Sequence, residues 1–171
     1  LIEIVTEPEL SSPKEALRLL NKLRATLEYL DVFDPEKEGS IRVDANISIK
    51  GHERVEIKNI SSYKGIEKAL TFEITRQKNL IRRGGTIARE TRHFQEGKGI
   101  TTSARSKETA TDYRYFPEPD LPVIRVANWV KDITLPELPD ARRDRFMKQY
   151  GIAVNHARTL TGDLRLAEFY E

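Results

Sequence analysis

The 171-residue sequence contains no cysteine. This absence excludes disulfide-stapled folds, cysteine-ligated zinc, iron–sulfur clusters and cysteine nucleophiles, and it fits a cytoplasmic protein. No apolar run approaches the roughly 18 residues that a membrane span requires, so no membrane contact is expected. Neither common glycine-rich phosphate loop is present, so a nucleotide bound by this chain is not held by a Walker motif.

The composition supports a folded core. Hydrophobic residues make up 38% and charged residues 33% of the chain, and the formal net charge is +2. This content excludes wholesale disorder, and the nearly balanced charge excludes a purely electrostatic nucleic-acid-binding arm. The opening residues LIEIV lack an initiator methionine and are typical of the middle of a strand, so we expect a fragment of a longer chain.

Hydrophobic periodicity places the expected elements. We predict helices over 12–33, 62–83, 140–150 and 163–171, and strands over 1–5, 40–50, 54–60, 86–94, 99–105 and 123–126. Ser12, Pro13 and Glu15 predict a capping box for the first helix, whose leucines we expect in the core. The segment 112–122 contains three prolines and fits neither helix nor ordinary strand. A change to helical period after residue 135 predicts a domain boundary near Thr134, giving units over 1–134 and 135–171.

The hairpin 40–60 is the first candidate site. A loop over 50–52 sets Asn46 opposite Glu56, whereas a loop over 51–53 sets Ser48 opposite it. Either loop gathers five polar side chains on one sheet face, namely Arg42, Asp44, Asn46, Glu56 and Lys58. Cross-strand neighbours lie about 5 Å apart, so Asp44 and Glu56 are close enough to share one Mg²⁺, with the two cations placed for phosphate oxygens. The alternative is a half-solvated face of cross-strand ion pairs.

Glu3 and a basic stretch are the other candidates. Glu3 lies within an apolar strand pattern, where a carboxylate needs a metal, a basic partner or a proton, unless one face of that strand is wet. Between Arg76 and Lys107, nine Lys or Arg residues stand against two Glu residues. This stretch predicts contact with RNA or phosphate, and the alternative is a solvated helix face followed by a charged hairpin.

Several motifs together resemble one family. They are residues 1–8 (LIEIVTEP), 39–48 (GSIRVDANIS), 54–59 (RVEIKN), 90–92 (ETR), 112–122 (DYRYFPEPDLP) and 136–140 (PELPD). In this order they resemble the GatB subunit of the tRNA-dependent amidotransferases, over essentially the whole chain.

The resemblance implies a fold and an activity. The fold is α+β, an antiparallel sheet with packed helices similar to the glutamine synthetase and guanido kinase fold, followed by the beginning of an all-α domain. The activity is ATP- and Mg²⁺-dependent phosphorylation of the side-chain carboxylate of Glu-tRNA(Gln) or Asp-tRNA(Asn), then amidation. The ammonia is released from glutamine by an amidase partner, GatA, and a small partner, GatC, completes the complex.

The resemblance also implies residue roles. Glu3, Asp44 and Glu56 match acidic residues of the metal and nucleotide site. Arg42, Asn46, Lys58 and Asn59 are expected to contact phosphate or substrate, and of these Arg42 and Lys58 are the nucleotide-binding candidates. Two other hypotheses are a non-catalytic tRNA-binding module built on the basic stretch, and the related archaeal GatE, which is specific for Glu-tRNA(Gln).

Overall fold

The computed structural model describes residues 3–34, 36–37, 40–106 and 119–171. Most of the proline-containing segment 112–122 therefore lies outside the described residues. The described elements are, in chain order, α1 (Pro13–Tyr29), β1 (Val43–Ile47), β2 (Val55–Ile60), α2 (Tyr63–Arg82), β3 (Glu90–Gln95), β4 (Ile100–Ser106), the 3-10 helix η1 (Trp129–Asp132), α3 (Pro139–Tyr150), α4 (Val154–Thr161) and α5 (Leu164–Tyr170).

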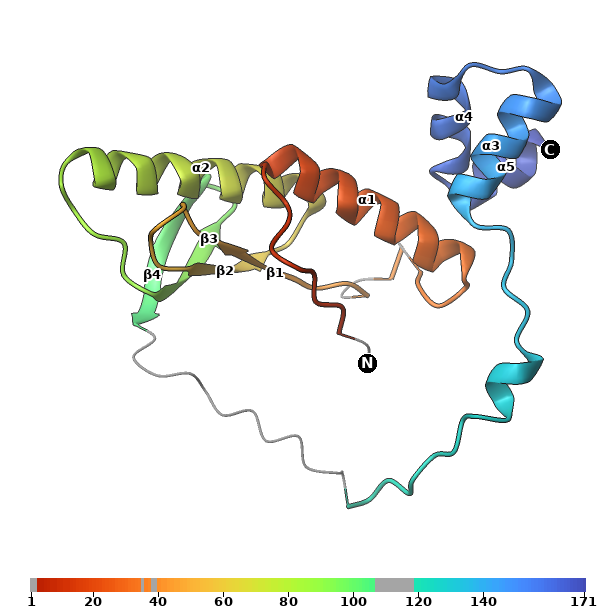
Figure 1. The fold of residues 1–171 in the computed structure, drawn as a ribbon, viewed down its shortest axis with the longest axis horizontal. Coiled ribbons are helices and arrows are strands. Elements are labelled where there is room, and N and C mark those ends of the chain that lie inside the picture. Colours follow the sequence, from red (N-terminus) through yellow and green to blue (C-terminus); the bar gives the residue numbers. More distant parts are fainter. Residues whose placement is uncertain (1–2, 35, 38–39, 107–118) are drawn as a thin grey trace.

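The strands form one mixed sheet in the order β1-β2-β3-β4, and α1 and α2 lie on the same side of it (Figure 1). β1 pairs antiparallel with β2, and β3 pairs antiparallel with β4. β2 and β3 are parallel, so the expected fully antiparallel sheet is wrong at this pair. The reason is α2, which carries the chain back along the sheet so that β3 runs in the same direction as β2.

The main core lies between α2 and the sheet. It contains Ile57 and Ile60 of β2, Phe94 of β3, and Ile66, Ala69 and Leu70 of α2. Gly84 ends this helix as expected, because it takes a φ of +76° and Gly85 donates its N–H to the Leu80 carbonyl at 3.0 Å. This packing fixes the buried face of β2 and directs Glu56 and Lys58 to the other face.

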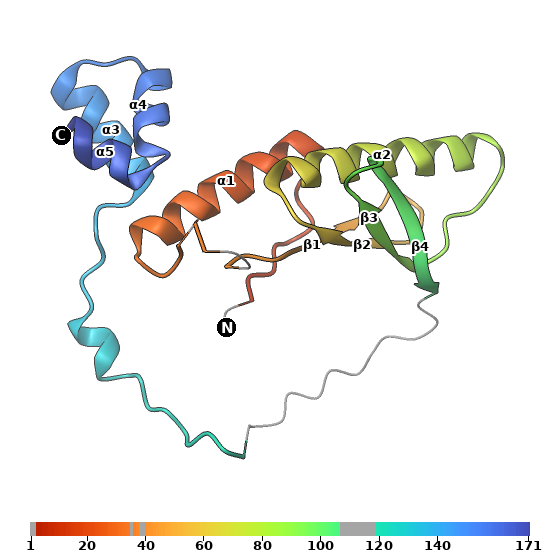
Figure 2. The same ribbon diagram turned by 180° about the vertical axis from the view of Figure 1, so that it is seen from behind.

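The start of α1 is capped nearly as predicted. The Ser12 hydroxyl accepts a hydrogen bond from the Glu15 N–H at 3.2 Å, but the Glu15 carboxylate accepts from the Ser11 N–H at 2.8 Å, one residue earlier than in a capping box. The predicted leucine core is confirmed only in part: Leu20 packs against the main core, but the leucines of α1 are half-buried and its buried residues are Ala25, Glu28 and Tyr29. α1 extends beyond the end of the sheet, so much of it has no sheet beneath it (Figure 2).

Two predicted strands are wrong. Residues 3–5 form no strand, with Ile4 and Val5 exposed by 52% and 82%, and residues 123–126 form none, with Val123 exposed by 90%. A strand requires a neighbour for its backbone hydrogen bonds, and within the described residues neither segment has one. The apolar composition of these two segments does not indicate whether a neighbouring strand is present.

The C-terminal helices pack against the end of α1. α3 and α5 agree with the prediction, whereas α4 was missed because its pattern is short and lies between Gly151 and Gly162. Tyr29 of α1 shares a core with Phe146, Ala157 and Ala167. The domain boundary near Thr134 stays a prediction. No helix in the described part of the chain has the length and hydropathy of a membrane span.

Candidate functional site

The candidate site lies on the face of the sheet that α1 and α2 leave uncovered (Figure 1). The observed register sets Asn46 opposite Glu56, which confirms the loop over 50–52. Arg42 and Asp44 precede Asn46 at alternate positions, as predicted. The hairpin therefore brings its predicted polar residues to one face.

A lysine lies between two carboxylates at the centre of this face. Lys58 Nζ donates to Asp44 Oδ2 at 2.9 Å and lies 3.7 Å from Glu56 Oε1. Arg42 Nε lies farther out, 3.9 Å from Asp44 Oδ1, on a side chain that is 79% exposed. The hydrogen bond to Asp44 raises the pKa of Lys58 above its ordinary value, against the opposing effect of burial. The Lys58 ammonium lies where the carboxylates of Asp44 and Glu56 together favour a positive charge.

A β-bulge aims Lys58 at Asp44. Between the pairs Val43–Ile60 and Ala45–Ile57 the register shifts, so β2 carries one residue more than β1. The extra residue is accommodated at Lys58–Asn59, where Asn59 takes a φ of +62°. Asparagine tolerates this left-handed conformation better than most residues. The structure thus gives Asn59 a backbone role in shaping the site, next to the substrate contact predicted for its side chain.

β3 extends the polar face beyond the hairpin. Thr91 is the parallel partner of Glu56, and its hydroxyl donates to Glu56 Oε2 at 2.8 Å. Thr91 is only 2% exposed, so this hydrogen bond is shielded from water. His93, the partner of Lys58, is exposed on the same strand. Sequence reasoning missed both residues, because no local signal fixes the register between strands that a 20-residue helix separates.

Glu3 does not join this cluster in the structure. It is exposed, and within the described residues it forms no hydrogen bond or ion pair. No group of three or more His, Cys, Asp or Glu residues in the described part of the chain is placed to hold a metal ion. Asp44 and Glu56 nevertheless fit Mg²⁺, since this ion is often held by one or two carboxylates while water and phosphate supply its remaining oxygens. The three-ligand set stays a prediction.

The basic stretch divides into a part that pairs with the buried Glu73 and an exposed part. Arg76 Nη2 lies 2.6 Å from Glu73 Oε1 and Arg92 Nε lies 3.5 Å from Glu73 Oε2, with Glu73 fully buried between α2 and the sheet. Burial raises the pKa of Glu73, but hydrogen bonds from Arg76, Gln77 and Thr101 outweigh it and hold the pKa below the ordinary 4.5. Arg76 and Arg92 therefore neutralise a carboxylate in the core. The exposed part includes Lys78, Arg82, Arg83 and Arg89.

Comparison with known proteins gives one consistent result. Residues 1–132 match the family model described as GatB/GatE catalytic domain. The chain is 74% identical over 171 residues to the GatB subunit of the aspartyl/glutamyl-tRNA(Asn/Gln) amidotransferase of Methanospirillum hungatei. It is 63% identical over 173 residues to that of Methanosarcina acetivorans and 49% identical over 188 residues to that of Natronomonas pharaonis. These alignments include the whole chain but only 36%, 35% and 38% of the respective relatives.

Proposed function

Because the chain belongs to the family of the GatB/GatE catalytic domain, we propose that it is part of an amidotransferase subunit that activates the side-chain carboxylate of an aminoacyl-tRNA. The observation that carries this proposal is the Asp44–Lys58–Glu56 cluster on the open sheet face. Two carboxylates with an adjacent cation are suited to holding a metal–nucleotide complex. Phosphoryl transfer depends mainly on such positioning and charge neutralisation.

The proposed chemistry has two steps. An oxygen of the substrate's side-chain carboxylate attacks the γ-phosphorus of ATP, and the bond to the bridging oxygen breaks so that ADP leaves. The nitrogen of ammonia then attacks the acyl carbon, phosphate leaves with the transferred carboxylate oxygen, and the nitrogen loses a proton. The product is the amide on the same tRNA.

Each residue of the face has a role in these steps. Asp44 and Glu56 would hold Mg²⁺, which supplies charge neutralisation to the phosphates when bound. Lys58 and Arg42 contact the transferred phosphate, where negative charge is concentrated. Asn46 and the Asn59 side chain contact the substrate. Glu3 would be the third metal ligand, although it lies apart from Asp44 and Glu56 in this structure.

The whole activity needs more than these residues. The chain spans about 36% of the relative from Methanospirillum hungatei. We therefore propose that the 171 residues alone do not turn over, and that the amidase GatA, the small partner GatC and the remaining parts of a longer chain complete a cytoplasmic complex. The substrate is Glu-tRNA(Gln), Asp-tRNA(Asn) or both.

Two alternatives have less support. The family description includes both GatB and GatE, but the relatives aligned above are GatB subunits. A purely RNA-binding function gives the Asp44–Lys58–Glu56 cluster no role. The basic surface that such a function requires is also smaller than the sequence suggested, because Arg76 and Arg92 both pair with Glu73.

The test is isotope transfer in the complete complex. The full-length natural chain and its partner subunits receive Glu-tRNA(Gln) labelled with ¹⁸O in the side-chain carboxylate, with ATP and glutamine. The proposal predicts ATP-dependent amide formation and one ¹⁸O atom in the released inorganic phosphate. Amide formation without ATP, or phosphate free of the label, contradicts the proposed activation.

A further inference from the structure

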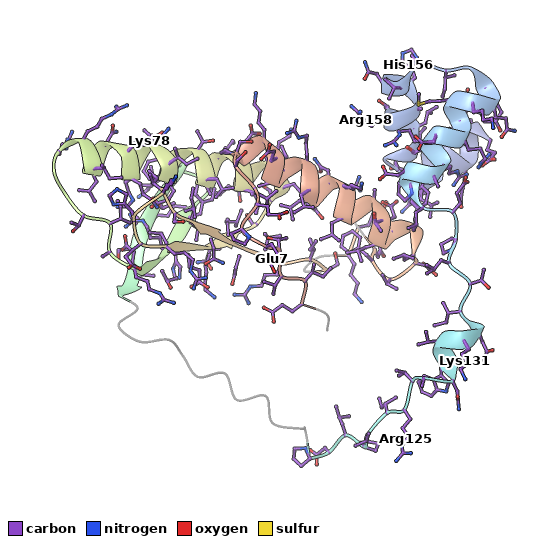
Figure 3. The ribbon with its side chains drawn as sticks, viewed as in Figure 1. Glu7, Lys78, Arg125, Lys131, His156 and Arg158 are labelled. Carbon is purple, nitrogen blue, oxygen red and sulfur yellow. The ribbon has the colours of Figure 1, made fainter. Side chains whose placement is uncertain are left out.

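The outer side of α2 carries a single line of polar residues along its length. Positions 64, 68, 71, 75, 78 and 82 recur at helical spacing and are all exposed, on the side opposite the buried Ile66, Ala69, Leu70, Glu73 and Gln77. Four of the six are cations, namely Lys64, Lys68, Lys78 and Arg82, and the other two are Thr71 and Thr75. Figure 3 labels Lys78 on this helix. At 1.5 Å per residue the line is about 27 Å long. We call these six residues the α2 stripe.

The four cations of the α2 stripe are not used within the fold. None forms a salt bridge or hydrogen bond in the described part of the chain, although Lys68 contributes to a lowered pKa of Glu96. α1 provides the contrast: its Arg18 and Arg24 have carboxylates at 3.8 Å and 3.4 Å, and its Lys22 pairs with Asp140. Three of the four cations of α1 thus have a carboxylate partner, whereas none of the four stripe cations has a hydrogen bond or salt bridge within the described residues.

Helix stability does not explain the α2 stripe. Cations favour the last turn of a helix, which accounts for Arg82. Lys64 lies in the first turn, where the helix dipole disfavours positive charge, and that turn contains no acidic residue. Lys64 therefore reduces helix stability, and Lys68 and Lys78 gain nothing from the dipole, so a contact outside this fold is the better explanation for these three lysines.

We propose that the α2 stripe binds the phosphate backbone of RNA, an inference that rests on the proposed action on aminoacyl-tRNA. An extended line of cations matches an extended polyanion. A protein partner fits less well, because protein interfaces are anchored by buried apolar and aromatic side chains and no large apolar side chain of α2 is exposed. The stripe and the Asp44–Lys58–Glu56 cluster lie on opposite sides of the sheet. RNA bound along the stripe therefore does not cover the cluster at which the carboxylate reacts.

Binding of a fluorescent glutamine-tRNA transcript, without ATP or glutamine, tests this inference. The full-length natural chain is compared as wild type, as the stripe variant K64Q/K68Q/K78Q, and as the control variant K37Q/K50Q/K131Q, which removes the same charge from exposed lysines elsewhere. The stripe variant should bind about tenfold more weakly, with a shallower dependence of log Kd on log salt, while the control stays near wild type. Circular dichroism verifies that both variants fold.

The outcomes separate the two proposals. Equal weakening in both triple variants indicates bulk charge, and no weakening in either indicates a solvated helix face; both results overturn the α2 stripe but leave the activation chemistry intact. If the wild type itself does not bind the transcript, the inference fails, while the proposed function is decided separately by the isotope-transfer experiment. Loss of an acidic protein partner from the complex, with RNA binding unchanged, reassigns the stripe to that protein.

Discussion

Lys58 of β2 donates a 2.9 Å hydrogen bond to the carboxylate of Asp44 on β1. This contact exists because β2 has one more residue than β1 at this point and Asn59 absorbs the difference with a φ of +62°. The geometry of the candidate site thus depends on a backbone conformation as much as on charge. The left-handed φ of Asn59 therefore helps to determine where the Lys58 ammonium lies.

Asn59 therefore gives the first prediction. Asn59→Gly should keep the bulge, whereas Asn59→Ala should lower the free energy of unfolding by about 1 kcal/mol, because alanine has a Cβ but lacks the polar side chain that lets asparagine tolerate the left-handed conformation. Urea denaturation measures both, with Ser48→Ala, at an exposed position just after β1, as the control. If the glycine variant keeps its activity and the alanine variant loses it, the backbone role dominates. Equal loss of activity in both variants assigns the effect to the Asn59 side chain.

Thr91 is predicted to position the Glu56 carboxylate. Thr91→Val preserves shape but removes the donor of the 2.8 Å hydrogen bond, and it should weaken Mg²⁺ binding by about tenfold, as loss of a group that orients a metal ligand does. Thr91→Ser keeps the hydroxyl and should restore most of the affinity. Calorimetric titration with Mg²⁺ and a non-hydrolysable ATP analogue measures the effect on the full-length chain. An unchanged affinity in Thr91→Val excludes this role.

Glu73 gives a prediction about pH and stability. Its pKa is held below 4.5, so its ionised form stabilises the fold above about pH 4.5, and this contribution is lost as the pH falls through the lower folded pKa. Glu73→Gln removes the buried carboxylate that Arg76 and Arg92 share, leaving them only Glu90 at 3.4 Å and 2.9 Å, and should cost about 3 kcal/mol at pH 7.

Urea unfolding at several pH values measures the Glu73 contribution. The cost of Glu73→Gln should shrink as the pH falls from 5 to 3, since the wild-type carboxylate then becomes protonated. Glu67→Gln, a change on the same helix outside its buried core, should leave the stability near wild type at each pH. A cost of Glu73→Gln that does not depend on pH contradicts the assignment.

The local parts of the fold were predictable from sequence. Ser12 and Ser62 cap helices, Gly84 ends one, and the alternation in 40–60 narrowed the hairpin register to two possibilities, of which the structure shows the one that sets Asn46 opposite Glu56. The non-local parts were not. The parallel pairing that brings Thr91 to Glu56 depends on how α2 packs across the sheet, and the bulge at Asn59 has no signal in the alternation pattern.

The count of charges along the sequence also gave a wrong expectation, because it too ignores how the chain folds. The nine cations between Arg76 and Lys107 suggested one basic patch, but Arg76 and Arg92 turn inward to the buried Glu73. Glu73 is placed there by α2, whose buried face it shares with Ile66 and Leu70. A sum over a sequence window does not distinguish a cation paired in the core from one that is exposed.

We propose above that the Asp44–Glu56 face binds a magnesium–nucleotide complex. Calorimetric titration of the full-length chain with Mg²⁺–ATP tests this binding, comparing wild type with Asp44→Asn, Glu56→Gln and Glu3→Gln, and with Glu53→Gln as the control for an exposed carboxylate of the same hairpin. Each of the first three variants should bind at least about tenfold more weakly, and the control should keep the wild-type affinity. Wild-type affinity in both Asp44→Asn and Glu56→Gln, with the fold intact, contradicts the proposal.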